Sequence, residues 1–175
     1  MKHKQKIDFI IAIILILIGV IILILPIINI LNIKYMLIVI LALYAVLNLI
    51  QYLLTKESND YEGIQTFIAS IVGVIACTII DISSSPGNLA MVLMLWIIIM
   101  SLCKLKKIDY YHDRKDKMWI IHLTTLVLFM LAGILTSFNL AYTKETQTLI
   151  IGFFMLTHGI LELFDPLVKY LLEKK

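Results

Sequence analysis

Six long apolar segments, separated by short polar ones, constrain this chain more than any other feature. A helix needs about 20 apolar residues to cross the roughly 30 Å hydrocarbon core of a bilayer. Lipid offers no hydrogen-bond partner to an unpaired backbone group, so the crossing segments must be helices. The sequence therefore predicts an all-α, polytopic membrane protein with six transmembrane helices. The predicted spans are Ile7–Ile28, Tyr35–Leu54, Ile64–Ile82, Asn88–Cys103, Met118–Leu140 and Gln147–Val168.

The composition agrees with a chain whose surface faces lipid. Of the 175 residues, 61% are hydrophobic and 15% are charged, whereas a soluble domain has about 45–50% apolar and about 25% charged residues. A chain this short cannot hide such a surplus in one core. The net charge of +3 does not indicate nucleic acid, because the basic residues flank apolar segments and form no separate basic domain. We therefore expect the lipid bilayer, and not nucleic acid, as the partner.

The distribution of basic residues predicts the orientation in the membrane. Thirteen of the 15 lysine and arginine residues fall at the two termini and in the loops after the second and fourth spans, and only Lys34 and Lys144 fall on the other side. Basic residues favour the cytoplasmic side. The sequence thus predicts a multi-pass protein of the plasma (inner) membrane with both termini in the cytoplasm. The first span is longer than the apolar part of a signal peptide, about 7–15 residues, so we expect it to be retained.

The loop predicted after the fourth span, Lys104–Lys117, is a candidate for contact with anionic lipids. A basic residue near an anionic membrane surface contributes about 1 kcal/mol. The alternative is that this segment only fixes the topology, since its three aspartates dilute its charge. The basic residues predicted to contact lipid are Lys104, Lys106, Lys107, Arg114, Lys115 and Lys117.

An internal repeat groups the spans in pairs. Gly19, in a Leu-Ile-Gly-Val-Ile stretch, recurs as Gly133 with an offset of 114, and the same offset pairs Ala45–Leu49 with Gly159–Leu163. Gly73 fits with an offset of 54, although the second helix of that middle pair aligns poorly. The sequence therefore predicts three parallel hairpins over residues 7–54, 64–103 and 118–168. Such repeats are related by an axis along the membrane normal.

The glycines within the spans are predicted to be packing positions. A missing side chain lets two helix backbones approach closely, which is how small residues act at helix contacts in membranes. The residues predicted to serve this purpose are Gly19, Gly73, Gly133 and Gly159.

The hairpin pattern resembles a known family. A mid-helix glycine is followed seven residues later by a proline (Gly19 and Pro26), and a second helix holds Gly152 and the Gly-Ile-Leu-Glu-Leu stretch Gly159–Leu163. In these features the chain is similar to the DUF308 short-repeat membrane proteins, typified by the bacterial acid-resistance membrane protein HdeD. The resemblance covers nearly the whole chain. It implies a six-helix fold in a bacterial membrane and a role in envelope or acid-stress tolerance.

The sequence carries no motif that indicates an enzyme. We find no phosphate-binding glycine loop, no His-Glu-x-x-His and no paired cysteine motif. The four histidines are scattered, and the two cysteines, Cys77 and Cys103, lie at different depths of the predicted helices. The sequence therefore predicts no catalytic residues, no bound metal and no cofactor.

Ionisable residues inside the spans form the strongest candidate site, because charge at membrane depth is costly. His158 and Glu162 are four residues apart and share a helix face. His122 is expected near the depth of Glu162 on the antiparallel neighbour, and Asn48 is the repeat equivalent of Glu162. Because histidine titrates near neutral pH, these four residues predict a proton-responsive network. The alternative is a set of ordinary interhelical hydrogen bonds, with Glu162 and Asp165 reaching the cytoplasmic interface.

Two function classes follow. The first is a non-enzymatic membrane protein of the HdeD-like kind that contributes to stress tolerance. The second is a small transporter or channel, working as a homo-oligomer, with a polar path near His158 and Glu162. Water-accessible positions at mid-membrane depth would separate the second from the first.

Overall fold

Six helices, each long and apolar enough to cross a membrane, make up the protein. The computed structural model describes residues 3–28, 32–55, 62–140 and 143–173, and these contain no strand. The predicted all-α fold with six spanning helices is therefore confirmed. The helices are α1 (His3–Ile24), a 3₁₀ turn η1 (Leu25–Ile28), α2 (Ile33–Thr55), α3 (Glu62–Ile79), α4 (Pro86–Asp113), α5 (Met118–Phe138) and α6 (Lys144–Glu173).

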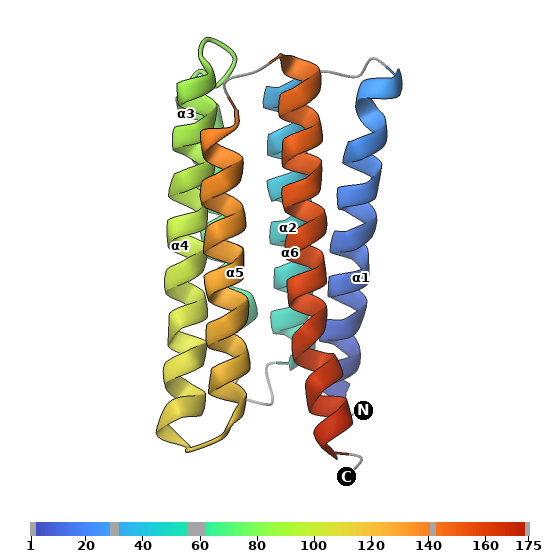
Figure 1. The fold of residues 1–175 in the computed structure, drawn as a ribbon, viewed down its shortest axis with the longest axis vertical. Coiled ribbons are helices and arrows are strands. Elements are labelled where there is room, and N and C mark those ends of the chain that lie inside the picture. The colour runs from blue at the N-terminus through green and yellow to red at the C-terminus, as the bar shows by residue number, and fades with distance from the viewer. Residues whose placement is uncertain (1–2, 29–31, 56–61, 141–142, 174–175) are drawn as a thin grey trace.

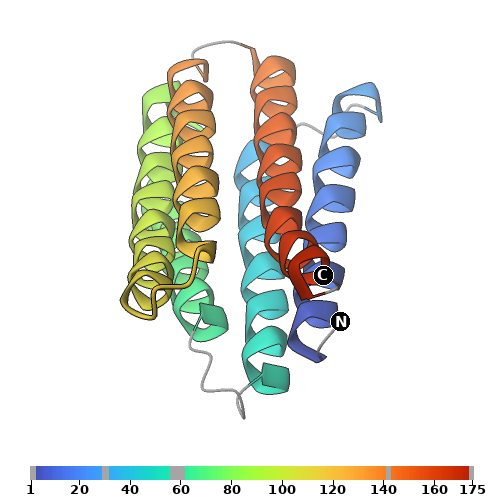
Figure 2. The same cartoon turned by 60° about the horizontal axis from the view of Figure 1, so that its bottom comes forward.

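The helices form a closed bundle in which each packs on its neighbours in sequence and α6 returns to α1 (Figures 1 and 2). The first helix begins and the last helix ends at the same end of the bundle, which we call the terminal end (Figure 1). The most extensive contacts join α6 to α1, α2 to α3 and α4 to α5. Each of these pairs connects the second helix of one predicted hairpin to the first helix of the next, so the same kind of interface occurs three times. The exact boundaries of the hairpin repeats stay a prediction.

Two glycines allow the backbones of α1 and α6 to approach each other closely. A Cβ atom at Gly19 would lie 2.5 Å from the backbone nitrogen of Leu156 on α6, and one at Gly159 would lie 2.7 Å from the backbone nitrogen of Ile16 on α1. No side chain fits at such distances from backbone. Gly73 faces side chains of α2 and α4, and Gly133 faces the side chain of Ile97 on α4. All four glycines that the sequence predicted as packing positions therefore lie against a neighbouring helix.

The fourth helix differs most from the sequence prediction. It was expected to end at Cys103 and to be followed by a loop, but α4 runs 28 residues from Pro86 to Asp113, about 42 Å at 1.5 Å per residue. Its start follows common capping rules: Ser85 accepts a hydrogen bond from the Gly87 nitrogen and Pro86 takes the first turn. Its extension is stabilised by lysine side chains that point into the bundle, as described below. The expected short span and most of the expected loop Lys104–Lys117 were therefore wrong.

Proline modifies two other helices. Pro26 lies in the 3₁₀ turn that follows α1, where its missing N–H and fixed backbone angle end the α-helix. The expected first span, Ile7–Ile28, thus contains an α-helix that stops at Ile24. Pro166 lies inside α6, fully buried, and the helix continues past it to Glu173.

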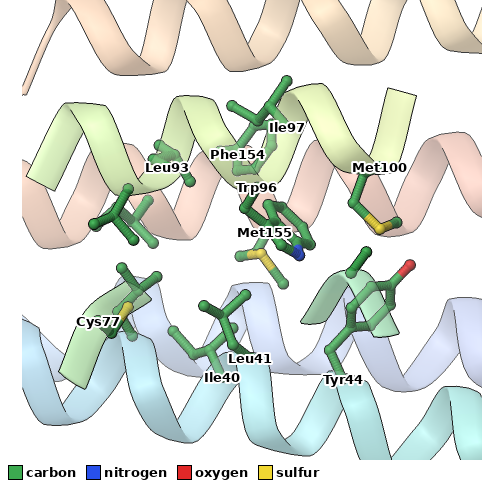
Figure 3. Packing of buried hydrophobic residues seen from close by; sticks show 14 of the residues in the cluster. Ile40, Leu41, Tyr44, Cys77, Leu93, Trp96, Ile97, Met100, Phe154 and Met155 are labelled. Atoms are coloured by element: carbon green, nitrogen blue, oxygen red, sulfur yellow. The ribbon is translucent and has the colours of Figure 1, made fainter. Parts of the chain in front are cut away.

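The interior is formed by equivalent positions on α2, α4 and α6. In successive layers, buried side chains come from the same three helices: Leu37, Leu89 and Ile151; Ile40, Val92 and Phe154; Leu41, Leu93 and Met155; and Tyr44, Trp96 and His158. Figure 3 shows Leu41, Tyr44, Trp96 and Met155 directed toward the same interior space. The outward faces carry large exposed apolar side chains, among them Leu17, Ile79, Leu135, Phe138 and Phe153. These faces suit contact with lipid.

The equivalence also explains the poor alignment of the middle repeat. Gly19 precedes Tyr44 by 25 residues and Gly133 precedes His158 by 25, but Gly73 precedes Trp96 by 23. The middle hairpin is therefore two residues shorter between its packing glycine and its central aromatic residue.

Candidate functional site

Charged side chains from five helices, α1 and α3 to α6, meet inside the bundle toward the terminal end. We call this group the ionic cluster; it comprises Asp8 of α1, Glu62 of α3, Lys104 and Lys107 of α4, His122 of α5, and Glu162 and Asp165 of α6. Helix α2 adds the neutral side chains of Asn48 and Gln51. Charges are rare inside transmembrane segments and are found there paired with one another.

Lys107 is the centre of the ionic cluster. Its ammonium nitrogen lies 2.7 Å from Glu62 Oε1 and 2.5 Å from Asp165 Oδ2. The side chain of Lys107 is 17% exposed, and those of its two partners are 17% and 13% exposed. One cation therefore connects α3, α4 and α6 away from bulk water. Removing one partner of such a buried pair leaves an uncompensated charge.

His122 extends the ionic cluster to α5. Its Nδ1 lies 2.9 Å from Asp165 Oδ1, and the ring is 4% exposed. Tyr111 of α4 stacks on the imidazole with ring centroids 4.7 Å apart. Lys169 of α6 donates to the Tyr111 hydroxyl and also lies over the tyrosine ring. Among the described residues, His122 Nε2 is buried and has no hydrogen-bond partner.

Glu162 and His158 form a second part of the site. Lys104 forms an ion pair with Glu162 Oε1. His158 Nδ1 lies 3.7 Å from the same oxygen, which is too long for a hydrogen bond. On its other side, His158 Nε2 lies 3.1 Å from the Tyr44 hydroxyl. The imidazole is fully enclosed, with Trp96, Phe129 and Phe154 rings around it.

Neutral hydrogen bonds attach α1 and α3 to α2 beside the ionic cluster. Gln51 Nε2 donates to Asp8 Oδ1 at 2.6 Å, so the described hydrogen-bond partner of Asp8 is a neutral amide. Thr66 Oγ1 donates to Asn48 Oδ1 at 2.6 Å, and Asn48 Nδ2 donates to the Tyr44 carbonyl at 2.7 Å. These bonds hold the buried amides in fixed orientations, as buried polar groups require.

Two small cavities lie within the site. The first has a volume of about 20 Å³ and is lined by Asp8, Ile11, Leu15, Tyr44, Asn48, Gln51, Glu62, Thr66, Lys107, Glu162 and Asp165. The second has a volume of about 10 Å³ and is lined by Lys104, Lys107, His122, Thr125, Leu161, Glu162 and Asp165. About 10–15 Å³ holds one water molecule when polar atoms surround it. Both cavities are therefore of the size of single water molecules.

The ionisable groups of the site can bind and release protons. Carboxylates, imidazoles and a phenol can each gain or lose a proton. Within the part of the chain that the structure describes, no three His, Cys, Asp or Glu side chains are arranged to hold a metal ion. Beyond Tyr44, toward the other end of the bundle, the interior layers are apolar, from Leu41 and Met155 to Leu37 and Ile151.

The structure brings the four residues of the predicted polar network to one site. His122 and Glu162 line the second cavity, Asn48 and Glu162 line the first, and His158 lies beside Glu162. The carboxylates of Glu162 and Asp165 point inward to lysines, unlike the alternative in which they reach the interface. Asn48 belongs to the site through neutral hydrogen bonds.

The predicted lipid contacts divide into two sets. Lys104 and Lys107 have their ammonium groups on carboxylates inside the bundle, which differs from the sequence prediction. The other four are exposed, and their contact with anionic lipid stays a prediction; they are Lys106, Arg114, Lys115 and Lys117.

Sequence reasoning missed Asp8, Glu62 and Lys107 as members of the site. Asp8 lies at the edge of the predicted first span, and Glu62 lies just before the predicted third span, in a charged segment that is typical of a loop. A signal for Lys107 was present: Trp96, Met100, Lys104, Lys107 and Tyr111 follow one another at spacings of three or four, which places them on one helix face.

A comparison with protein families identifies a match over most of the chain. The model described as a short repeat of unknown function (DUF308) matches residues 10–80 and 124–169. The two matched segments begin at Ile10 and Thr124, 114 residues apart, which is the offset of the internal repeat. No match to a curated protein or to a solved structure was found.

Proposed function

The chain belongs to the DUF308 short-repeat family, and from that premise we propose that it is a non-enzymatic membrane protein that supports acid or envelope-stress tolerance through its ionic cluster. The observation that carries the proposal is the position of Lys107 between Glu62 and Asp165, with His122 on the same aspartate. Placing an ionisable group at membrane depth costs free energy, so a residue of this kind is taken as a candidate functional residue. Their proton occupancy would change when the pH of the neighbouring compartment falls.

The proposal includes an orientation. We propose that the terminal end of the bundle faces the cytoplasm of a bacterial cell and that the protein lies in the plasma membrane. The positive-inside rule supports this, because both termini and the exposed basic residues at the end of α4 lie at the terminal end. The ionic cluster then lies in the cytoplasmic half of the bundle, where acidification of the cytoplasm would reach it.

The mechanism follows from the ion pairs. A proton on Asp165 or Glu62 removes the charge that holds Lys107, and a proton on Glu162 removes the charge that holds Lys104. Because these pairs join α4 to α3 and α6, acidification would loosen the terminal end of the bundle. The apolar layers beyond Tyr44 would stay packed. The protein would thereby convert a pH change into a change of shape at one membrane face.

A deletion strain tests the function. We expect it to survive acid or envelope stress less well than the parent, and we expect the wild-type gene and Lys144→Met to restore survival. Lys144 is exposed at the other end of the bundle, so this control removes a lysine without touching the ionic cluster. Lys107→Met, His158→Gln and Glu162→Gln should restore survival poorly at equal protein level. Full rescue by all three variants, or a deletion without effect under every stress, would contradict the proposal.

A small transporter or channel is the second candidate, and the first cavity is the observation that favours it. Its lining contains polar atoms from α1, α2, α3, α4 and α6, as a polar path through the bundle would need, although at about 20 Å³ it would have to widen to admit a solute larger than water. Against a continuous path stand the apolar layers on the other side of Tyr44. A homo-oligomer would not remove these layers, because they lie inside each bundle. Transport would therefore require a rearrangement of the interior.

A further inference from the structure

The hydrogen bonds and ion pairs of the site fall into two groups, which no hydrogen bond among the described residues joins directly. The first, which we call the His122 group, consists of Glu62, Lys107, His122 and Asp165. The second, the His158 group, consists of Tyr44, Lys104, His158 and Glu162. Among the described residues, the structure shows no direct hydrogen bond from a member of one group to a member of the other.

The second cavity lies between the two groups. Its lining includes Lys107, His122 and Asp165 from the first group and Lys104 and Glu162 from the second. A water molecule needs about 10–15 Å³ and two to four polar partners. The cavity volume of about 10 Å³ and the five polar groups around it meet these conditions for a single water and exclude a larger ligand.

An unsatisfied nitrogen at this cavity points independently to a ligand. His122 lines the cavity, its side chain is 4% exposed, and its Nε2 has no hydrogen-bond partner in the described part of the protein. Buried polar atoms in native proteins are nearly always paired with protein or with ordered water. The other ring nitrogen, Nδ1, lies 2.9 Å from Asp165 Oδ1.

We infer that one water molecule occupies the second cavity, binds His122 Nε2 and joins the His122 and His158 groups into one proton-sharing network. The role in proton sharing rests on the proposed function, whereas the water site itself does not. A proton placed on Glu162 passes to the water, and the water gives another of its protons to His122 Nε2. The water ends as it began, Glu162 is again a carboxylate, and the proton is on His122, which becomes an imidazolium.

The groups that face His122 decide how it responds to pH. From α4 it is faced by Lys104, Lys107 and the ring of Tyr111, and from α6 by Asp165 and Glu162. Glu62 of α3 acts on it electrostatically from the other side of Lys107. Lys169 lies behind Tyr111. With three carboxylates and three lysines around it, His122 exchanges a proton as part of the network and not alone.

Solid-state nuclear magnetic resonance on the full chain, ¹⁵N-labelled at histidine in lipid bilayers, tests the water site. Magnetisation transferred from water protons should reach His122 Nε2 within a short mixing time, and the signal is assigned by its loss in His122→Gln. Thr125→Leu places a larger side chain in the cavity and should abolish the transfer. Thr124→Leu is the matched control, because Thr124 is exposed on the neighbouring position and its substitution should leave the transfer unchanged.

The outcomes separate this inference from the proposed function. Absence of water transfer to His122 Nε2 in the wild-type chain overturns the water site, and this result needs no variant to fold. Transfer that persists in a correctly folded Thr125→Leu protein also overturns it. Thr125→Val, which keeps the volume of threonine, should retain the water and shows that loss in the leucine variant reflects filling of the cavity. None of these readouts depends on stress survival, so the proposed function can fail while the water site stands.

Discussion

Tyr44 and His158 lie 114 residues apart and are joined by a hydrogen-bond contact of 3.1 Å between the tyrosine hydroxyl and imidazole Nε2. The offset is that of the internal repeat, so the two residues occupy equivalent positions in the first and third hairpins. Trp96 completes the set from the second hairpin, with its ring centroid 5.9 Å from that of Tyr44 and 6.0 Å from that of His158. The three repeats therefore meet at one aromatic layer inside the bundle.

Below this layer the repeats have diverged in charge. The first hairpin places Asn48 and Gln51 at the positions where the third places Glu162 and Asp165. The second supplies the compensating cations, Lys104 and Lys107, near the end of α4. The ionic cluster thus arises because the inward helix face carries neutral side chains in the first hairpin, basic ones in the second and acidic ones in the third.

We expect Lys107→Met to destabilise the protein strongly. The substitution leaves Glu62 and Asp165 without their cation, and breaking a buried ion pair in this way costs about 3–5 kcal/mol. Lys106→Met removes the same charge from the exposed neighbouring position and should change stability by less than about 1 kcal/mol. Unfolding in detergent, followed by helical circular dichroism, measures both. Equal effects of the two substitutions would show that Lys107 is not the centre of the cluster.

Removing the two counter-charges together with Lys107 should restore part of the lost stability. The triple variant Lys107→Met, Glu62→Gln, Asp165→Asn removes the cation together with both of its carboxylate partners, so neither carboxylate is left buried without its cation. We expect it to unfold at higher temperature than Lys107→Met alone. A triple variant as unstable as the single one would indicate that the lysine acts through its packing and not through its charge.

Gly19 should tolerate substitution less well than Gly133. A Cβ at Gly19 meets the backbone of Leu156 at 2.5 Å, whereas one at Gly133 meets the flexible end of the Ile97 side chain at 2.6 Å. Overpacking costs about 1–3 kcal/mol, and more when the neighbour cannot move. Thermal unfolding of Gly19→Ala and Gly133→Ala measures the difference, with Gly87→Ala as the control, where a Cβ would meet only the Ser85 hydroxyl, at 3.3 Å. A more stable Gly19→Ala than Gly133→Ala would contradict the α1–α6 packing described here.

The orientation predicts the behaviour of reporter fusions. A reporter that is active only in the cytoplasm should be active when fused after Asp116, which lies at the terminal end of the bundle. It should be inactive when fused after Ser85 or Glu145, because both of these lie at the opposite end (Figure 1). The physical reason is the distribution of basic residues. Activity at Ser85 or Glu145 would reverse the orientation and place the ionic cluster at the outer face.

Cysteine labelling along α6 distinguishes a one-sided site from a continuous path. In a chain without Cys77 and Cys103, cysteine at position 162 should react with a water-soluble thiol reagent from the cytoplasmic side, because thiolates form only where water reaches. Cysteines at Ile151 and Met155, in the apolar layers, should not react. The lipid-facing position Ile160 is the control for reaction outside the bundle. Reaction at Ile151 would favour the transporter.

The number of helices and the packing glycines could be predicted from the sequence because both depend on local properties. Apolar length fixes a membrane-spanning helix, and Gly19 recurs with a recognisable context. The position of His158 and Glu162 on one helix face could be predicted because the two are four residues apart. The role of Lys107 could not be predicted in the same way, because a charged segment after an apolar one is typical of a loop. Only the three-dimensional position of Glu62 and Asp165 shows why α4 continues to Asp113.

Whether the ionic cluster binds protons is best tested by infrared difference spectroscopy of the protein in bilayers, recorded as the pH is lowered from neutral. We expect buried carboxyl groups to take up protons, which appears as a protonated-carboxyl band whose position indicates a water-poor environment. That band should weaken in the triple variant Asp8→Asn, Glu162→Gln, Asp165→Asn, which includes the cluster carboxyl bonded to a neutral amide, and should persist in Asp109→Asn, an exposed carboxyl on α4. A spectrum with no buried-carboxyl band down to the pH at which the bundle unfolds would contradict a proton-responsive ionic cluster.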